Sequence, residues 1–168
     1  FLLIGFGLRS PESLLPPPSG STTVVICAYN EELDIAKTID SLFKQTMPVH
    51  RIIVMDDASD DRTGEIARKL GADVEFRPLK EDGETHGKAA NQKHSLEELV
   101  DTEYIAFVDA DTWLYPDAME EAMRFFNDPN TKAVGGFVLP KNLTNVWELG
   151  RYCQYLYGFG TAKAGKNN

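Results

Sequence analysis

The sequence predicts an α/β domain with a mostly parallel β-sheet flanked by helices. Strand-like and helix-like runs alternate from about residue 23 onward, which is typical of this class. The first strand-like run, TVVICA at 23–28, is rich in β-branched residues and has no polar alternation, as expected for a strand covered on both faces. With 168 residues and a hydrophobic fraction of 42%, the chain is long enough for one domain with its own core.

The helix after this strand is predicted from the spacing of its apolar residues. They recur at i, i+1, i+4, i+7 and i+8, which places them on one helical face, and Pro48 follows them. These residues are Ile35, Ala36, Ile39, Leu42 and Phe43.

The remaining elements continue the alternation. Further strands are predicted at 51–55, 73–76, 104–108 and 132–139. Further helices are predicted near 62–70, where Gly71 is the C-cap, near 88–100, after Pro116, and at 143–159.

Charge and cysteine content narrow the function. The chain carries 17 Lys and Arg against 26 Asp and Glu, a net charge of −9, which argues against a nucleic-acid surface. An anionic partner would need a cation between it and the protein. Cys27 and Cys153 have neither metal-ligand spacing nor a disulfide pattern and are interpreted as buried thiols in a reducing compartment.

The first 22 residues differ in composition from the predicted core. Residues 1–9 are apolar but too short to cross a bilayer, which takes about 20 residues. We interpret them either as the end of a transmembrane helix or as an apolar arm on the domain. Residues 10–22 are rich in proline and serine and are predicted to be a linker.

Three acidic clusters follow predicted strands. They are AYNEE at 28–32, DDASDD at 56–61 and DAD at 109–111. Ligands of open parallel sheets bind beyond the carboxyl ends of the strands, so these side chains are expected to converge if the strands are neighbours. Carboxylates that converge must take up protons or bind a cation, and one or two of them with substrate phosphates form a usual Mg²⁺ site. The alternative is that Asp109 and Asp111 cap the helix after Pro116 or shape a turn.

Other polar residues near the strand ends suit a nucleotide. Asp57 lies at a strand edge, where its carboxylate can accept a base N–H or a ribose hydroxyl, whereas Asp60 and Asp61 are predicted to cap the next helix. HGKAANQ at 86–92 places Lys88 at a helix start that suits a phosphate, and the alternative is a solvated lysine. Tyr29 either stacks on a planar base or fills the turn.

In their order, VVICAYNEE, IIVMDDASDDRT, HGKAANQ and YIAFVDADTWLYPDAME resemble the family 2 glycosyltransferases with the GT-A fold. The resemblance covers about residues 22–140 and implies a Rossmann-like sheet that forms a nucleotide-sugar-binding core at 23–140. The segment NVWELGRYCQYLYGFG is similar to the one that follows this core in membrane-bound processive synthases of cellulose, hyaluronan and poly-N-acetylglucosamine.

The resemblance also implies roles for individual residues. Asp57 would accept a hydrogen bond from uracil, Tyr29 would lie against the base, and Lys88 would lie near the diphosphate. Asp109 and Asp111 would place Mg²⁺ or Mn²⁺ on that diphosphate. The residues expected to bind the nucleotide are Ala28, Tyr29, Glu31, Asp57, Lys88 and Asp109.

The general base of this family is an acidic residue in a later motif, and neither that motif nor Q-x-x-R-W occurs in this sequence. We therefore expect the base beyond Asn168 and a fold that is incomplete at the C-terminus. Residues 141–168 are expected to form an aromatic helix and the truncated start of an acceptor region. Its aromatic side chains would contact a membrane interface, an acceptor glycan or the rest of the fold; they include Trp147, Tyr152, Tyr155, Tyr157 and Phe159.

The expected function is the donor-binding part of an inverting glycosyltransferase. It would use a UDP-sugar and a divalent metal, with a glycan or another hydroxyl compound as acceptor and no nucleic acid as partner. Its expected location is the cytoplasmic side of a membrane, with a soluble cytoplasmic protein as the alternative. The other functions considered are a non-catalytic nucleotide-sugar-binding or assembly module and, less favoured, a haloacid-dehalogenase-like phosphatase, which wants its D-x-D on the first strand.

Overall fold

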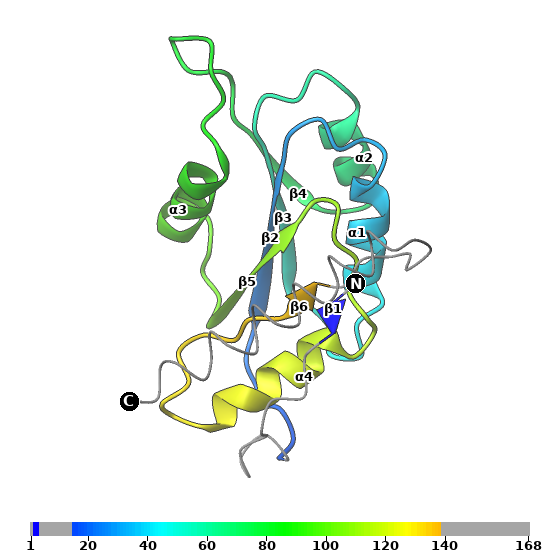
Figure 1. Ribbon diagram of the computed structural model, residues 1–168, viewed down its shortest axis with the longest axis vertical. Helices are drawn as coiled ribbons and strands as arrows, with labels where there is room; N and C mark the ends of the chain where they lie inside the picture. Colours follow the sequence, from blue (N-terminus) through cyan, green and yellow to red (C-terminus); the bar gives the residue numbers. More distant parts are fainter. Residues whose placement is uncertain (1, 4–14, 139–168) are drawn as a thin grey trace, which may run out of the picture.

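The computed structural model describes residues 2–3 and 15–138, and these form an open parallel sheet with helices on both faces (Figure 1). Four strands pair in the order β4-β3-β2-β5, and all three pairings are parallel. This confirms the predicted fold class. The elements are β1 (Leu2–Leu3), β2 (Thr22–Ala28), α1 (Ile35–Phe43), β3 (Arg51–Asp56), α2 (Thr63–Lys69), β4 (Asp73–Phe76), α3 (Lys88–Glu98), β5 (Tyr104–Asp109), α4 (Ala118–Arg124), η2 (Phe125–Asn127) and β6 (Phe137–Val138).

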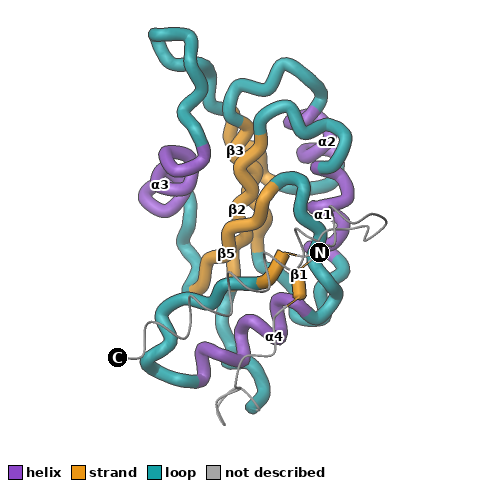
Figure 2. Tube along the Cα trace, viewed as in Figure 1, coloured by secondary structure: helices purple, strands orange, loops and turns teal. Residues whose placement is uncertain are grey.

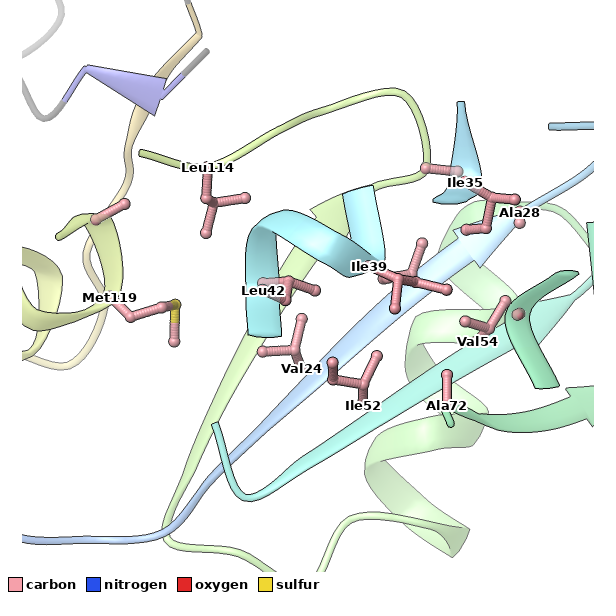
Figure 3. Packing of buried hydrophobic residues seen from close by; sticks show 14 residues of the cluster. Val24, Ala28, Ile35, Ile39, Leu42, Ile52, Val54, Ala72, Leu114 and Met119 are labelled. Atoms are coloured by element: carbon pink, nitrogen blue, oxygen red, sulfur yellow. The ribbon is translucent and has the colours of Figure 1, made fainter. Parts of the chain in front are cut away.

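The core lies mainly on the sheet face that α1, α2 and α4 cover. Val24, Ile26 and Ala28 of β2 point to this face, where they pack with Ile39 and Leu42 of α1 (Figure 3). Each fully buried side chain of this size contributes about 1.5–3 kcal/mol, so this cluster holds the helical layer on the sheet. The alternation of β2 agrees with burial of both faces, because Val25 packs on the opposite side with Ile53 and Met55.

The opposite face carries α3, which stands apart from the other helices (Figure 1). Only two of its residues, Asn91 and Ser95, are buried. The apolar cover of this face comes instead from Leu99 and Val100 after the helix. The position of α3 therefore depends strongly on polar contacts at its first turn, which are described below.

The predicted boundaries of most elements agree with the structure to within two residues. The C-cap of α2 is Leu70, one residue before the predicted Gly71. Gly71 follows it with φ +90°, a conformation that glycine adopts without a Cβ penalty and that is common just after a C-cap. β2 starts at Thr22, one residue inside the predicted linker. The described end of that linker lies against α4 and η2, because Arg124 donates to the carbonyl of Leu15 and Asn127 donates to that of Pro16.

The strand predicted at 132–139 is wrong for most of its length. Only Phe137–Val138 form a strand, and it pairs antiparallel with β1 rather than joining the four-stranded sheet. Gly135 and Gly136 interrupt the run, and glycine weakens a strand because it loses more backbone freedom and has no side chain to pack. The helix predicted at 143–159 and the segment 141–168 lie outside the described residues. Of the apolar segment 1–9, Leu2 and Leu3 are described and form β1.

Candidate functional site

The carboxyl ends of β2, β3 and β5 meet at one edge of the sheet, as the sequence predicts. β2 lies between the other two strands, and its last residues pair with theirs: Ala28 with Asp56, and Cys27 with Asp109. Because all three strands run in the same direction, the loops that follow them gather at this edge (Figure 2). The three acidic clusters of the sequence therefore converge.

Three side chains at this edge, those of Cys27, Asp57 and Asp109, lie on the face of the sheet that carries α3. Cys27 packs with the apolar cluster on the α3 face, and its register partner Asp109 points the same way. Asp57 lies two residues after Met55, which belongs to that same cluster. Asp56 points to the other face, where a Cβ added at Gly64 of α2 would lie 2.4 Å from its Oδ2.

Three charged groups act on the thiol of Cys27. The pKa of this half-buried thiol is raised to about 11, mainly by burial; the Lys88 ammonium lowers the pKa, and the carboxylates of Asp109 and Asp57 raise it. A charge acts on a neighbour in this way only at short range. Asp57, Lys88 and Asp109, which are far apart in the sequence, therefore share one small region around the thiol.

Asp57 anchors the start of α3. Its carboxylate is buried, with the residue 5% exposed, and it accepts backbone N–H bonds from His86 at 2.9 Å and from Gly87 at 2.7 Å. Gly87 has φ +81°, which turns the chain into the helix so that both N–H groups face the carboxylate. Each carboxylate oxygen keeps a second lone pair for a ligand.

A second set of contacts around Arg77 holds the same turn. The Arg77 guanidinium donates to Oδ1 of the buried Asn91 at 3.1 Å and lies 3.1 Å from Nδ1 of His86. The other ring nitrogen of His86 lies 3.0 Å from the Pro78 carbonyl. Because a guanidinium only donates, Nδ1 must accept and Nε2 must carry the proton. Sequence reasoning missed Arg77, although its place directly after β4, at the same sheet edge, was a usable signal.

Lys88 and Asp109, both predicted to bind the nucleotide, contact each other through their charged groups. Their side chains are about half exposed, 56% and 55%, so the pair contributes little to stability and is open to exchange for other partners. Lys88 is therefore not simply a solvated helix residue. Asp109 does not cap α4 either, because the N-cap of that helix is Asp117.

Asp111 and Glu31 bring further negative charge to this edge. The pKa of Glu31 is raised, first by burial and then by the carboxylates of Asp111, Asp34 and Asp61. Asp111 itself is exposed, at the turn that follows β5. The predicted site residues Glu31 and Asp111 are therefore close enough to repel each other.

Tyr29 and Ala28 complete the predicted nucleotide residues. Tyr29, in the turn after β2, is 52% exposed. Ala28 is buried, and its carbonyl accepts the Asp57 N–H at 2.9 Å. This bond ties the end of β2 to the residue that anchors α3.

The loops after β2 and β3 are joined by side-chain hydrogen bonds, and we call residues 30–32 and 59–63 the crossed loops. The Asn30 N–H donates to Ser59, and the Asp60 N–H donates to the Asn30 side chain, both at 3.0 Å. The Glu31 N–H donates to Thr63 at 2.8 Å. Asn30 has φ +54°, which asparagine tolerates. These hydrogen bonds hold the crossed loops together as one surface beside the acidic residues.

Asp61 has the role that the sequence predicts at the start of α2. One of its carboxylate oxygens accepts the N–H of Thr63, the first helical residue, at 2.8 Å, and the other accepts the N–H of Glu32 at 3.0 Å. The matching prediction for Asp60 is not supported, because its contact with the loop is made by its backbone N–H. The N-cap position itself is occupied by Arg62.

A pocket of about 350 Å³ lies beside β5, next to the Lys88–Asp109 pair. Its wall is mostly apolar, and polar side chains enter it only at the end nearest the acidic edge. The lining includes Lys88, Asp109, Thr112, Phe107, Leu114 and Met119. Its volume is of the size that binds small ligands.

The side chains at this edge fit a divalent cation that a ligand helps to hold. Asp109 and Asp111 offer carboxylate oxygens, the ligand type that Mg²⁺ and Mn²⁺ prefer. Among residues 2–3 and 15–138, no group of three His, Cys, Asp or Glu side chains is close enough to enclose a metal. Such a pair suits a cation whose other ligands are substrate phosphates and water.

Substituting Glu31 by glutamine is expected to stabilise the protein at pH 7. The pKa of Glu31 is raised in the folded state, so folding favours the protonated form, and the ionised side chain opposes folding at neutral pH. The gain in unfolding free energy should shrink as the pH falls toward the ordinary Glu value of 4.5, where Glu31 itself takes up a proton. Urea unfolding at pH 7 and pH 4.5 measures this.

Glu65→Gln is the matched control with the opposite sign. The pKa of Glu65 is lowered by its hydrogen bond to Lys69, so the ionised form supports the fold and is lost as the pH falls. This variant should be slightly less stable than the parent at pH 7. A Glu31→Gln variant that is less stable than the parent at pH 7 would contradict the repulsion described here.

Comparison with known proteins identifies the family of the chain. The family model described as "Glycosyl transferase family 2" matches residues 23–165. The hyaluronan synthase of Streptococcus pyogenes is 28% identical over 165 residues, which cover 90% of this chain and 38% of that protein. The 4,4'-diaponeurosporenoate glycosyltransferase of Staphylococcus aureus is 41% identical over 101 residues, 60% of this chain and 26% of that protein. The chain thus spans well under half the length of these relatives.

Solved structures show the same fold. The mannosyltransferase PcManGT from Pyrobaculum calidifontis, in complex with GDP-Man and Mn²⁺, has a TM-score of 0.59 and 26% identity, covering 73% of this chain and 37% of that one. TarS 1-349 from S. aureus, in complex with UDP-GlcNAc, has a TM-score of 0.55 and 22% identity, covering 72% of this chain and 38% of that one. These similarities confirm the GT-A fold that the sequence predicts.

Proposed function

Because the chain belongs to glycosyl transferase family 2, we propose that it forms the donor-binding part of an inverting glycosyltransferase that uses a UDP-sugar and a divalent metal. The observation that carries this proposal is the convergence of Asp57, Lys88 and Asp109 at the carboxyl edge of the sheet: Lys88 contacts Asp109, and Gly87, the residue before Lys88, donates its N–H to Asp57. At this edge, the exposed aromatic ring suits a base, the ammonium suits a diphosphate, and the carboxylates suit a cation.

Each of these residues has a role that its surroundings allow. The Tyr29 ring is exposed and stacks on the base, and Asp57 accepts an N–H of uracil with the lone pairs that its two backbone bonds leave free. Lys88 leaves Asp109 and donates to the diphosphate from the first turn of α3, where the helix N-terminus also favours an anion. Ala28, the last residue of β2, and Glu31, in the loop that follows it, belong to the same proposed nucleotide site.

Asp109 and Asp111 would hold the cation, and Mn²⁺ in the PcManGT complex supports a divalent metal. The bound metal would supply positive charge that stabilises the departing nucleoside diphosphate without a proton transfer. The protein's own contribution is to hold the two carboxylates beside Lys88, so that the negative charge formed on the leaving group meets fixed partners.

The acceptor and the general base remain predictions. We propose that the acceptor is a glycan or another hydroxyl compound and that the base lies outside residues 1–168. Similarity to a hyaluronan synthase supports a polysaccharide product. We also propose that the protein acts at the cytoplasmic side of a membrane. No helix among residues 2–3 and 15–138 is long and apolar enough to cross a membrane.

The proposal predicts that UDP with Mn²⁺ raises the melting temperature of the chain. Ligand at 100 times its Kd adds about 2.7 kcal/mol of stability, which for a chain of this size is a rise of several degrees. The measurement is a thermal melt with UDP and Mn²⁺, with UDP and EDTA, and with Mn²⁺ alone. GDP with Mn²⁺ is the base-specificity control and should give a smaller rise. No rise with UDP and Mn²⁺ would overturn the proposal.

A further inference from the structure

We propose that Thr38 is a positioning residue for the metal-binding pair Asp109 and Asp111, an inference that rests on the proposed function. Thr38 lies in the middle of α1, on the opposite face of the sheet from Lys88. It therefore does not reach the donor. It acts through the chain segment that carries the two carboxylates.

The contact is a buried hydrogen bond to the residue between the two aspartates. The Thr38 hydroxyl, on a residue that is 0% exposed, donates to the Ala110 carbonyl at 2.6 Å. That carbonyl and the N–H of Asp111 belong to one planar peptide group. Holding the oxygen of this group therefore fixes the orientation of the peptide plane that joins Ala110 to Asp111. The direction in which the Asp111 side chain leaves the backbone is fixed with it, and so is the end of the segment that begins at Asp109.

The same face of α1 holds the segment that follows. The Ser41 hydroxyl accepts the N–H of Leu114 at 3.0 Å. Gln45, just beyond the helix, donates to the Tyr115 carbonyl at 2.8 Å and accepts the Met119 N–H at 3.0 Å. Ser41 lies three residues after Thr38, and Gln45 lies four residues after Ser41, so these side chains form one row along the helix. We call this row the polar row of α1.

Apolar packing supports the polar row. Ala110, Leu114 and Met119 are buried in the same cluster as Ile39 and Leu42 of α1 (Figure 3). This packing fixes where the segment lies, but it does not set the rotation of an individual peptide group. A buried carbonyl needs a hydrogen-bond donor, and Thr38 is the donor nearest to the two carboxylates along the row.

We therefore expect Thr38 to affect the part of the donor affinity that depends on the metal. A metal site needs its ligands held within about 0.5 Å, and loss of an outer contact that orients a ligand typically weakens metal binding about 10–100-fold. Asp57 and Tyr29 do not depend on Thr38. Binding of UDP without metal should therefore not change when the hydroxyl is removed.

The test compares two substitutions at Thr38 with one elsewhere in the core. Thr38→Val removes the hydroxyl at nearly constant volume, and Thr38→Ser keeps it. Thr23→Val is the control, because Thr23 is also 0% exposed and its hydroxyl is hydrogen-bonded to that of Thr102. Thr102 lies just before β5, at the opposite end of that strand from residues 109–111. UDP affinity is measured by calorimetry with Mn²⁺ and with EDTA, and hydrogen–deuterium exchange is followed at residues 110–114 without ligand.

Thr38→Val is expected to lose about tenfold or more of the affinity that Mn²⁺ adds and to exchange faster at residues 110–114. Thr38→Ser and Thr23→Val should stay within about threefold of the parent. If Thr38→Val does not fold, Ser41→Ala, which suits a helix, should give a smaller loss of the same kind.

Two results would overturn this inference and leave the proposed function intact. One is a folded Thr38→Val variant, or failing that a Ser41→Ala variant, that keeps the parental gain from Mn²⁺. The other is an equal loss of affinity with and without metal, which would indicate a general structural role. A parent chain that binds no UDP even with Mn²⁺ would overturn the proposed function and this inference together.

Discussion

Replacing Asp111 by asparagine is expected to abolish the rise in melting temperature that Mn²⁺ adds to UDP. The carboxylate of Asp111 is exposed at the turn after β5 and is close enough to Glu31 to raise the pKa of that residue. An amide oxygen carries no full charge, so it gives up most of the attraction to a dication while keeping the shape of the side chain. Thermal melts and calorimetry with and without Mn²⁺ measure the effect.

The unliganded Asp111→Asn protein should be at least as stable as the parent. Removing this charge relieves its repulsion of Glu31, and no described hydrogen bond of the core depends on it. The matched control is Asp117→Asn, because Asp117 is exposed only six positions further on and makes no side-chain capping bond. An Asp111→Asn variant that keeps the full gain from Mn²⁺ would remove Asp111 from the metal site.

Replacing Asp57 by alanine is expected to lower both the stability and the affinity for UDP. The carboxylate is 5% exposed and accepts the N–H groups of His86 and Gly87. Hydrogen bonds to a charged group contribute about 1.5–3 kcal/mol each, and both donors would be left unpaired, so we expect a loss of about 3 kcal/mol in unfolding free energy. α3 would lose the contact that holds its first turn, and Lys88 would lose its defined position.

Asp57→Asn separates the two hydrogen bonds. Its amide oxygen accepts one N–H, while its amide nitrogen is a donor and cannot accept the other, so its stability should lie between those of the parent and the alanine variant. Asp101→Ala, at an exposed aspartate, is the control for loss of charge alone. Urea unfolding gives the stability, and calorimetry with UDP gives the affinity. An Asp57→Ala variant with parental stability would show that the start of α3 is held by other contacts.

The central strands and their polar ends could be predicted because both depend on local sequence. A β-branched run without polar alternation is most easily buried as an inner strand, and β2 is an inner strand. Because the strands pair in parallel, Asp57 and Asp109 can be placed at the same edge of the sheet without knowing any distance. The same reasoning failed for residues 132–139, where the apolar residues suggested a strand but two adjacent glycines prevented most of it from forming.

The contacts that hold the site could not be predicted in the same way, because they join distant parts of the chain. Thr38 and Ala110 are separated by 72 positions, and nothing in the spacing of α1 shows that a threonine on its buried side faces a carbonyl. The place of Arg77 directly after the strand predicted at 73–76 indicates the edge of the sheet on which it lies, but no local pattern shows which side chains it contacts. Its contacts with His86 and Asn91 follow only once α3 is placed beside the sheet.

The crossed loops also affect how the molecule can fluctuate. Because each loop donates backbone N–H groups to side chains of the other, neither can peel away without breaking bonds that belong to both. We therefore expect residues 30–32 and 59–63 to open together rather than separately. A ligand bound against Tyr29 would contact loops that these hydrogen bonds already hold together, so ordering them on binding should cost little entropy.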